Sequence, residues 1–212
     1  LVDVTTHLVD LVQWQCFPGQ EIDYGKDIRM LSAERWPTPM TITQFKEITG
    51  DTGYPGFLTK HVKDSILQVY ANGEMNYTIR GVHVKIGVMW NYAAPAGTGD
   101  THFSILKGSK ASLVIRQGAA QGYVPELYIE PVQSSAEYEQ QLRKAFAKLE
   151  AEYPGLALKP VANGWQVSIP AKYQLDHEAT FAEVTKQFLK YLDAGKIPDW
   201  EKKGMLAKYF TT

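Results

Sequence analysis

Residues 82 to 91 alternate between apolar side chains and mostly polar or small ones, and this period of two limits the possible folds more than any other stretch. The apolar members are Val82, Val84, Ile86, Val88 and Trp90, and the residues between them are His83, Lys85, Gly87, Met89 and Asn91. Successive side chains of a β-strand point to opposite faces of a sheet. The stretch therefore predicts a strand with one buried and one open face, which is typical of an antiparallel sheet.

Turn signals divide the surrounding region into strands. Asn72-Gly73 is the dipeptide preferred by a type I′ hairpin, because both central residues of that turn need positive φ, and we expect a tight turn there. Gly81 interrupts the strand that follows and predicts a bulge or bend. Further hairpins are expected at Gly108-Ser109 and around Asn163-Gly164.

Helical patterns dominate both ends of the chain. Residues 1 to about 15 predict a helix that stops at Phe17-Pro18-Gly19, and residues 41 to 49 predict a short helix closed by Gly50. An amphipathic helix is expected after Ser134, and two more helices close the chain. We therefore predict an α+β fold in a single domain, residues 1–212, in which helices pack on one face of a mixed, largely antiparallel sheet.

Composition argues against several classes of function. Lys and Arg total 22 and Asp and Glu total 23, so the net charge of −1 provides no basic field for nucleic acid. No stretch approaches the roughly 20 apolar residues of a membrane span. The single cysteine, Cys16, cannot form an internal disulfide and has no obvious basic partner that would make it a nucleophile, which fits a reducing, cytoplasmic setting. The sequence contains no strand–GxGxxG–helix unit, P-loop or GxSxG motif.

The opening helix carries a stripe of unusual composition. Asp3, His7, Asp10 and Trp14 are spaced by four, three and four residues, so their side chains lie on one helix face. Spacing alone favours an ordinary solvated face. A carboxylate one turn before a histidine is also the arrangement of a catalytic pair, in which the acid fixes the imidazole tautomer and raises its basicity. A metal site is a third interpretation, and its fourth ligand would have to come from elsewhere.

The stripe and much of the remaining sequence resemble a known family. The pattern D-x-x-x-H-x-x-D, formed here by Asp3, His7 and Asp10, is similar to the substrate-domain signature of the glucose–fructose oxidoreductase and inositol dehydrogenase (Gfo/Idh/MocA) family. Three longer stretches resemble the C-terminal domain of oxidoreductases in one branch: HLVDLVQWQCFPGQEIDY, VYANGEMNYTIRGVHVKIGVMWNY and GDTHFSILKGSKASLVI. The resemblance covers most of the chain.

This resemblance implies an NAD- or NADP-dependent oxidoreductase that acts on a sugar or polyol hydroxyl. His7 would be the general base, Asp3 would orient it, and Asp10 would bond a substrate hydroxyl, whereas Trp14 is more typical of core packing and stays outside this site. In the family a Rossmann domain precedes this helix, binds the cofactor and contributes a catalytic lysine. We therefore expect a substrate domain without a cofactor or metal of its own, inactive by itself. Asp3 and His7 should face a concavity bordered by the sheet.

Histidines elsewhere have weaker signals. His83 and Lys85 are expected on the polar, open face of their strand. The resemblance implies that this face meets a second subunit or lines the substrate cleft, so we expect a homo-oligomer formed through the open sheet face. His102 follows a glycine-rich loop, which alone does not make it a ligand. The alternative function is a non-catalytic carbohydrate-binding or dimerisation module, in which the Asp/His stripe is merely solvated.

Overall fold

The chain forms two compact units. The computed structural model describes residues 2–175 and 177–212, apart from the side chains of Val2, Asp3 and His177. The units comprise Leu1–Ala93 with Gln187–Thr212, and Ala94–Lys186. Each unit contains one sheet. That residues 1–212 form a single domain stays a prediction. None of the helices in the described part of the chain has the length and apolar character needed to span a membrane.

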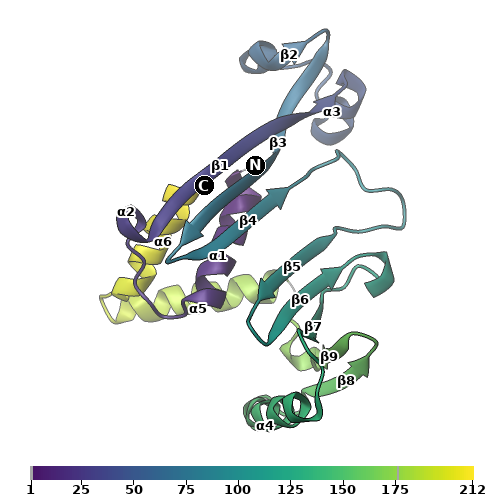
Figure 1. Cartoon of the computed structure of the whole chain (residues 1–212). Helices are drawn as coiled ribbons and strands as arrows, with labels where there is room; N and C mark the ends of the chain where they lie inside the picture. The colour runs from purple at the N-terminus through teal and green to yellow at the C-terminus, as the bar shows by residue number, and fades with distance from the viewer. Residues whose placement is uncertain (1, 176) are drawn as a thin grey trace. The chain divides into compact units, whose positions relative to one another are not determined.

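Strand β3 is the centre of the first unit's sheet (Figure 1). β3 (Ile66–Ile79) pairs antiparallel with β1 (Ile28–Met40), with β4 (Val82–Val88) and with the short β2 (Val62–Lys63). The helices of this unit are α1 (Val2–Cys16), α2 (Tyr24–Asp27), α3 (Ile42–Thr49), the 3-10 helix η1 (Gly56–His61) and α6 (Asp199–Thr211).

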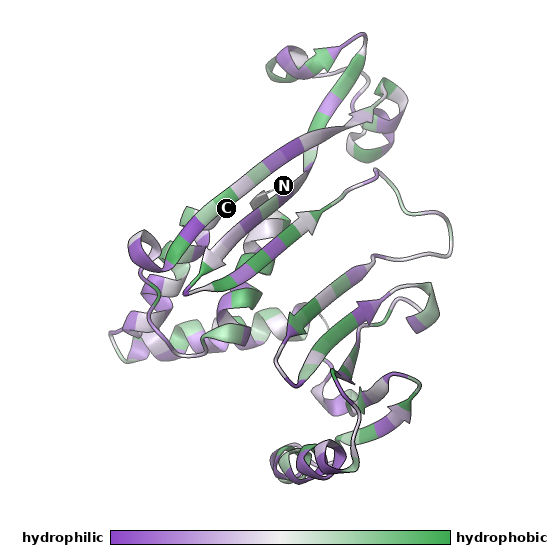
Figure 2. Ribbon diagram, in the orientation of Figure 1, coloured by the Kyte–Doolittle hydropathy of each residue, from purple (hydrophilic) through white to green (hydrophobic). Residues whose placement is uncertain are grey.

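The core of the first unit lies between α1 and one face of the sheet. Val9 of α1 is 1% exposed and packs in one cluster with Tyr77 of β3 and Ile86 of β4. Full burial of an aliphatic side chain of this kind contributes about 1.5–3 kcal/mol. The opposite sheet face is hydrophilic, and Figure 2 shows green and purple residues alternating along β1, β3 and β4. The alternation predicted after residue 82 is therefore confirmed.

Asn72-Gly73 is not a turn, so this prediction was wrong. Both residues lie inside β3, and Asn72 is 2% exposed. Its Nδ2 donates to Thr38 Oγ1 at 2.8 Å, and its Oδ1 accepts from the Trp90 N–H at 2.7 Å. These bonds satisfy polar groups beside a register shift in β1, between Trp36 and Thr38. Partners distant in sequence thus override the local turn preference.

The turn lies instead at Arg80-Gly81, where we expected a bulge or bend. Arg80 has a φ of 48° and Gly81 a φ of 81°, so both central residues have the positive φ that a type I′ hairpin needs. Ile79 and Val82 form the pair that flanks the turn. β3 therefore ends at Ile79 and β4 begins at Val82, so these residues form the two strands of a hairpin and not one continuous strand.

The second unit is a five-stranded sheet with one long helix. The strand order is β5 (His102–Lys107), β6 (Ala111–Gln117), β7 (Glu126–Pro131), β9 (Gly164–Ser168) and β8 (Ala157–Val161). Helix α4 (Ala136–Glu152) packs Phe146 against Ile129 and Val167. The predicted hairpins are confirmed. β5 pairs with β6 across Gly108-Ser109, and β8 pairs with β9 across a turn at Ala162-Asn163, so that Gly164 already belongs to β9.

The α+β class is confirmed, with one difference in the sheet. All described strand pairs are antiparallel, and the strands are divided between two sheets rather than joined in one mixed sheet. The predicted helices are present, including α3, where Thr41 and Gln44 form a capping box and Gly50 ends the helix at a φ of 79°. The remaining elements are η2 (Ala119–Gln121), η3 (Ala171–Tyr173) and α5 (His177–Asp193), within which the boundary between the units falls.

Candidate functional site

Helix α1 directs His7, Asp10 and Trp14 away from the core. Residues at i, i+3 and i+7 share one helix face, and the opposite face of α1 carries Val9 and Val12, which pack against the sheet. His7 is exposed, and its imidazole has no hydrogen-bond or ion-pair partner among residues 4–175 and 178–212. His7 is therefore not a core histidine. The side chain of Asp3 lies outside the described residues, so its pairing with His7 stays a prediction.

A concavity beside the Asp10 and Trp14 end of this stripe is bordered by α6, whereas the expected concavity in front of Asp3 and His7 stays a prediction. The apolar face of α1 occupies the sheet side, so the polar stripe is left to meet α6. A pocket of about 90 Å³ lies between the end of α1, residues 17–22 and the first turns of α6. Asp10 and Trp14 line this pocket, and His7 lies outside its lining.

Asp10 faces a lysine of α6. Lys208 Nζ lies 3.8 Å from Asp10 Oδ2 and 5.2 Å from the centre of the Tyr209 ring. The ion pair is longer than a hydrogen bond, so the carboxylate keeps its capacity to accept bonds from another group. One turn further along α1, Gln13 is buried, and the orientation of its amide that satisfies both neighbours donates to the Gly204 carbonyl at 3.1 Å and accepts from the Lys208 N–H at 3.2 Å. These contacts hold α1 and α6 together behind the pocket.

Two tryptophans form the rim of the pocket. The rings of Trp14 and Trp200 are 5.8 Å apart and meet edge to face at 87°. Trp14 is nevertheless 56% exposed, which is unusual for so large an apolar ring. We expected Trp14 to be a core residue, and the structure places it at a pocket mouth instead.

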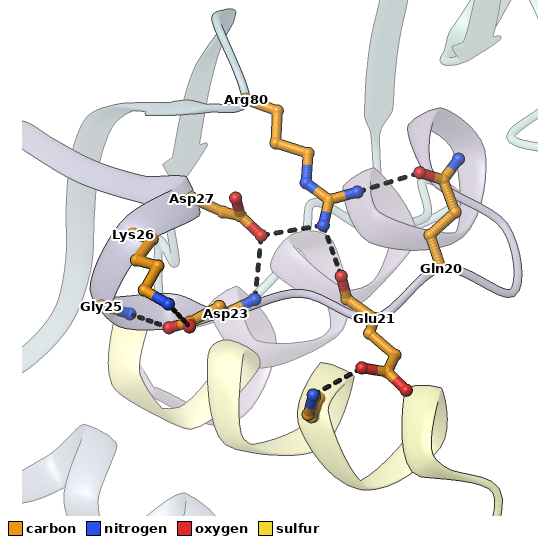
Figure 3. Close-up of polar contacts among 8 residues, drawn as sticks. Gln20, Glu21, Asp23, Gly25, Lys26, Asp27 and Arg80 are labelled. Atoms are coloured by element: carbon orange, nitrogen blue, oxygen red, sulfur yellow. Dashed lines mark hydrogen bonds and ion pairs between the residues drawn. The ribbon is translucent and has the colours of Figure 1, made fainter.

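Arg80 braces the segment that forms one wall of the pocket (Figure 3). Its Nη1 donates to Gln20 Oε1 at 2.9 Å, and its Nη2 donates to the Glu21 carbonyl at 2.5 Å and to Asp27 Oδ2 at 2.9 Å. The guanidinium also lies 5.6 Å from the centre of the Phe17 ring. The β3–β4 turn thereby positions the connection between α1 and β1. The hydrogen bond from Arg80 is the main cause that lowers the pKa of Asp27.

Asp27→Asn is expected to lower the free energy of unfolding by about 1 kcal/mol near neutral pH. A hydrogen bond to a charged group contributes about 1.5–3 kcal/mol, and partial exposure of this pair reduces that value. Because the folded pKa of Asp27 is lowered, its stabilisation is present above the unfolded pKa of about 4 and is lost as the pH falls through the folded pKa. Urea denaturation of both proteins at neutral pH and below about pH 3 measures the effect.

The difference between wild type and Asp27→Asn should therefore shrink in acid. Asp51→Asn, which changes an exposed carboxylate of the same unit, is the matched control and should change stability little. If Asp27→Asn lowers the free energy of unfolding equally at neutral and at acidic pH, the assigned ion pair between Asp27 and Arg80 is contradicted.

The α6 side of the pocket was missed by the sequence analysis. Trp200, Glu201 and Lys208 line it, and they are nearly 200 positions from α1, with no local pattern that links them to it. His83 and Lys85 lie on the exposed face of β4 as predicted, and Lys85 pairs with Glu74 at 2.8 Å. His102 begins β5 in the second unit and is half-buried.

Metal and thiol chemistry find no support in the described residues. Among them, no group of three or more His, Cys, Asp or Glu side chains is arranged to hold a metal ion, although Asp3 falls outside that set. Cys16 is half-buried, and burial raises the pKa of its thiol, which opposes formation of a thiolate nucleophile.

Comparison with known proteins identifies the family. The model of the putative oxidoreductase C-terminal domain family matches residues 1–212. The chain belongs to this family. It is similar to the crystal structure of a putative oxidoreductase from Parabacteroides merdae, with 56% sequence identity and a TM-score of 0.95 over 98% of this chain. This oxidoreductase C-terminal domain spans about half of that neighbour, 48% of its length. A search among curated proteins finds no match.

Proposed function

We propose that this oxidoreductase C-terminal domain is the substrate domain of a Gfo/Idh/MocA-type enzyme that oxidises a hydroxyl group of a sugar or polyol. The observation that carries the proposal is the exposed imidazole of His7, on the polar face of α1 and one turn before Asp10. An imidazole titrates near neutral pH and is a common general base. Membership of an oxidoreductase family supports the same chemistry.

Three residues of α1 divide the work in this proposal. His7 takes the proton of the hydroxyl whose carbon is oxidised. Asp3, one turn earlier, orients the imidazole and stabilises its protonated form. Asp10 accepts a hydrogen bond from a neighbouring substrate hydroxyl, beside the ammonium of Lys208 at 3.8 Å.

The dinucleotide does not fit the residues described in this chain. A nicotinamide cofactor accepts hydride, and its pyrophosphate is usually bound where a parallel strand leads into a helix N-terminus. All described strand pairs here are antiparallel, so the two sheets offer no such turn. We therefore propose that NAD or NADP binds outside these residues.

The test uses the chain alone and a longer protein that also contains the cofactor-binding segment. The longer protein should reduce NAD or NADP with at least one member of a panel of hexoses, glycosides and inositol, measured by the absorbance of the reduced nicotinamide. The chain alone should show no turnover and no binding of either dinucleotide by calorimetry. Micromolar binding by the chain alone would contradict the cofactor assignment, and failure of the whole panel would contradict the substrate class.

The open face of the first sheet is where we expect a second copy of the chain to bind. Its side chains are hydrophilic and are exposed or half-buried, including Glu74, Asn76, Thr78, His83 and Lys85. Light scattering on the chain tests this proposal. Self-association without any oxidation by the longer protein would favour the alternative function, a non-catalytic dimerisation module.

A further inference from the structure

The polar stripe of α1 continues past His7 and Asp10 to Trp14, which the proposed chemistry does not use. Trp14 is more than half exposed, and the edge-to-face contact with Trp200 holds its ring in one orientation. An exposed aromatic ring of fixed direction is an apolar platform. The C–H face of a sugar ring is the common neutral ligand that combines an apolar face with a polar edge.

Hydrogen-bonding groups surround this platform. Asp10 and Glu201 are acceptors, Lys208 is a donor, and the amide of Gln20 is both. Arg80 fixes Gln20 through its Oε1, which leaves the amide N–H groups available. Sugar hydroxyls need donors and acceptors of this kind in close proximity to an apolar surface.

Charge selects against an anionic ligand. Of the pocket residues, two carry a negative charge, Asp10 and Glu201, and one carries a positive charge, Lys208. A phosphate or carboxylate would meet net repulsion and would lack the arginines that usually bind such groups. A neutral sugar meets no such barrier.

The position of the platform limits the length of the ligand. Trp14 lies seven residues after His7 on the same face of α1, which separates their Cα atoms by roughly 10 Å along the helix axis. One pyranose ring is too short to occupy both positions. The cavity of about 90 Å³ beneath the platform has room for roughly three waters, and so for the hydroxyl-bearing edge of one ring.

We infer that Trp14 and Trp200, together with Asp10, Gln20, Glu201 and Lys208, form a second sugar subsite. This inference rests on the proposed function for the position of the reacting ring. The substrate is then a neutral glycoside of at least two rings, with one ring oxidised beside His7 and the next ring stacked on Trp14. A free monosaccharide or inositol would occupy the site beside His7 only.

Calorimetric titration of the chain with neutral disaccharides of gluco, galacto and manno configuration tests the inference. At least one disaccharide should bind more tightly than its constituent monosaccharides and more tightly than glucose phosphate. Trp14→Ala should weaken that binding by about tenfold or more and leave monosaccharide binding unchanged. Trp14→Leu, which keeps an apolar contact with Trp200 but lacks the flat ring, should have a similar effect. Trp36→Ala, which removes an exposed tryptophan of β1, is the control.

Two results overturn the inference: no disaccharide binds, or binding is equal in wild type and both Trp14 variants. The outcome is separable from that of the proposed function, because disaccharide binding is measured on the chain alone, without nicotinamide, whereas oxidation is measured on the longer protein. If disaccharide binding depends on Trp14 but the longer protein oxidises no sugar or polyol, only the proposed function is refuted. If the longer protein oxidises only monosaccharides, and does so equally with and without the Trp14 side chain, only the second subsite is refuted.

Discussion

Replacing His7 by Asn in the longer protein is expected to lower turnover by about 10²–10⁴-fold, the usual effect of losing a general base. Asn cannot accept the hydroxyl proton, although its amide is similar in size to the imidazole. Because His7 is exposed and its imidazole has no partner among residues 4–175 and 178–212, the free energy of unfolding should change by less than about 0.5 kcal/mol. Turnover and urea denaturation of the same preparation separate the two effects.

His83→Asn is the matched control for this variant. His83 is also exposed, and it lies on the open face of β4, away from the α1 stripe. Its replacement should leave turnover close to wild type, and cofactor affinity should be nearly unchanged in both variants. Near-normal turnover of His7→Asn would remove His7 from the mechanism and leave the solvated-face interpretation of the stripe.

Gly164→Ala is expected to destabilise the second unit by about 4 kcal/mol or more, the upper end for single substitutions. Gly164 begins β9 at a φ of 140°, and a Cβ at this position would lie 2.1 Å from the carbonyl oxygen of Ile129. Backbone cannot yield as a flexible side chain can, so β9 would have to move away from β7. That movement would also separate Val167 from Phe146 of α4. Chemical denaturation with a tryptophan signal, which includes the buried Trp165, measures the loss.

Gly122→Ala separates conformational strain from the steric clash. Gly122 also has a positive φ, 58°, but a Cβ there would meet no heavy atom within 4 Å. Its replacement should therefore cost only about 1 kcal/mol of left-handed strain. Equal destabilisation by the two variants would contradict the predicted clash with Ile129.

Local patterns were sufficient where a segment's own side chains decide its structure. Thr41, Gln44 and Gly50 set both ends of α3 through bonds to neighbouring backbone. The period of two after residue 82 placed β4 correctly, because the core lies on one face of that strand. The spacing of His7, Asp10 and Trp14 correctly placed them on one helix face.

Contacts between distant segments decided the rest. Asn72-Gly73 has the local signature of a hairpin, but Asn72 is buried by bonds to Thr38 and Trp90, and those bonds exist only once β1 and β4 lie beside β3. The pocket likewise requires α6 to lie against α1, which brings Lys208 to Asp10 and Trp200 to Trp14. The sequence by itself determined which helix face is polar. Only the tertiary structure decided what that face meets. The apolar face of α1 packs against the sheet, so the polar face is left beside α6, and no pattern within α1 or α6 predicts this contact.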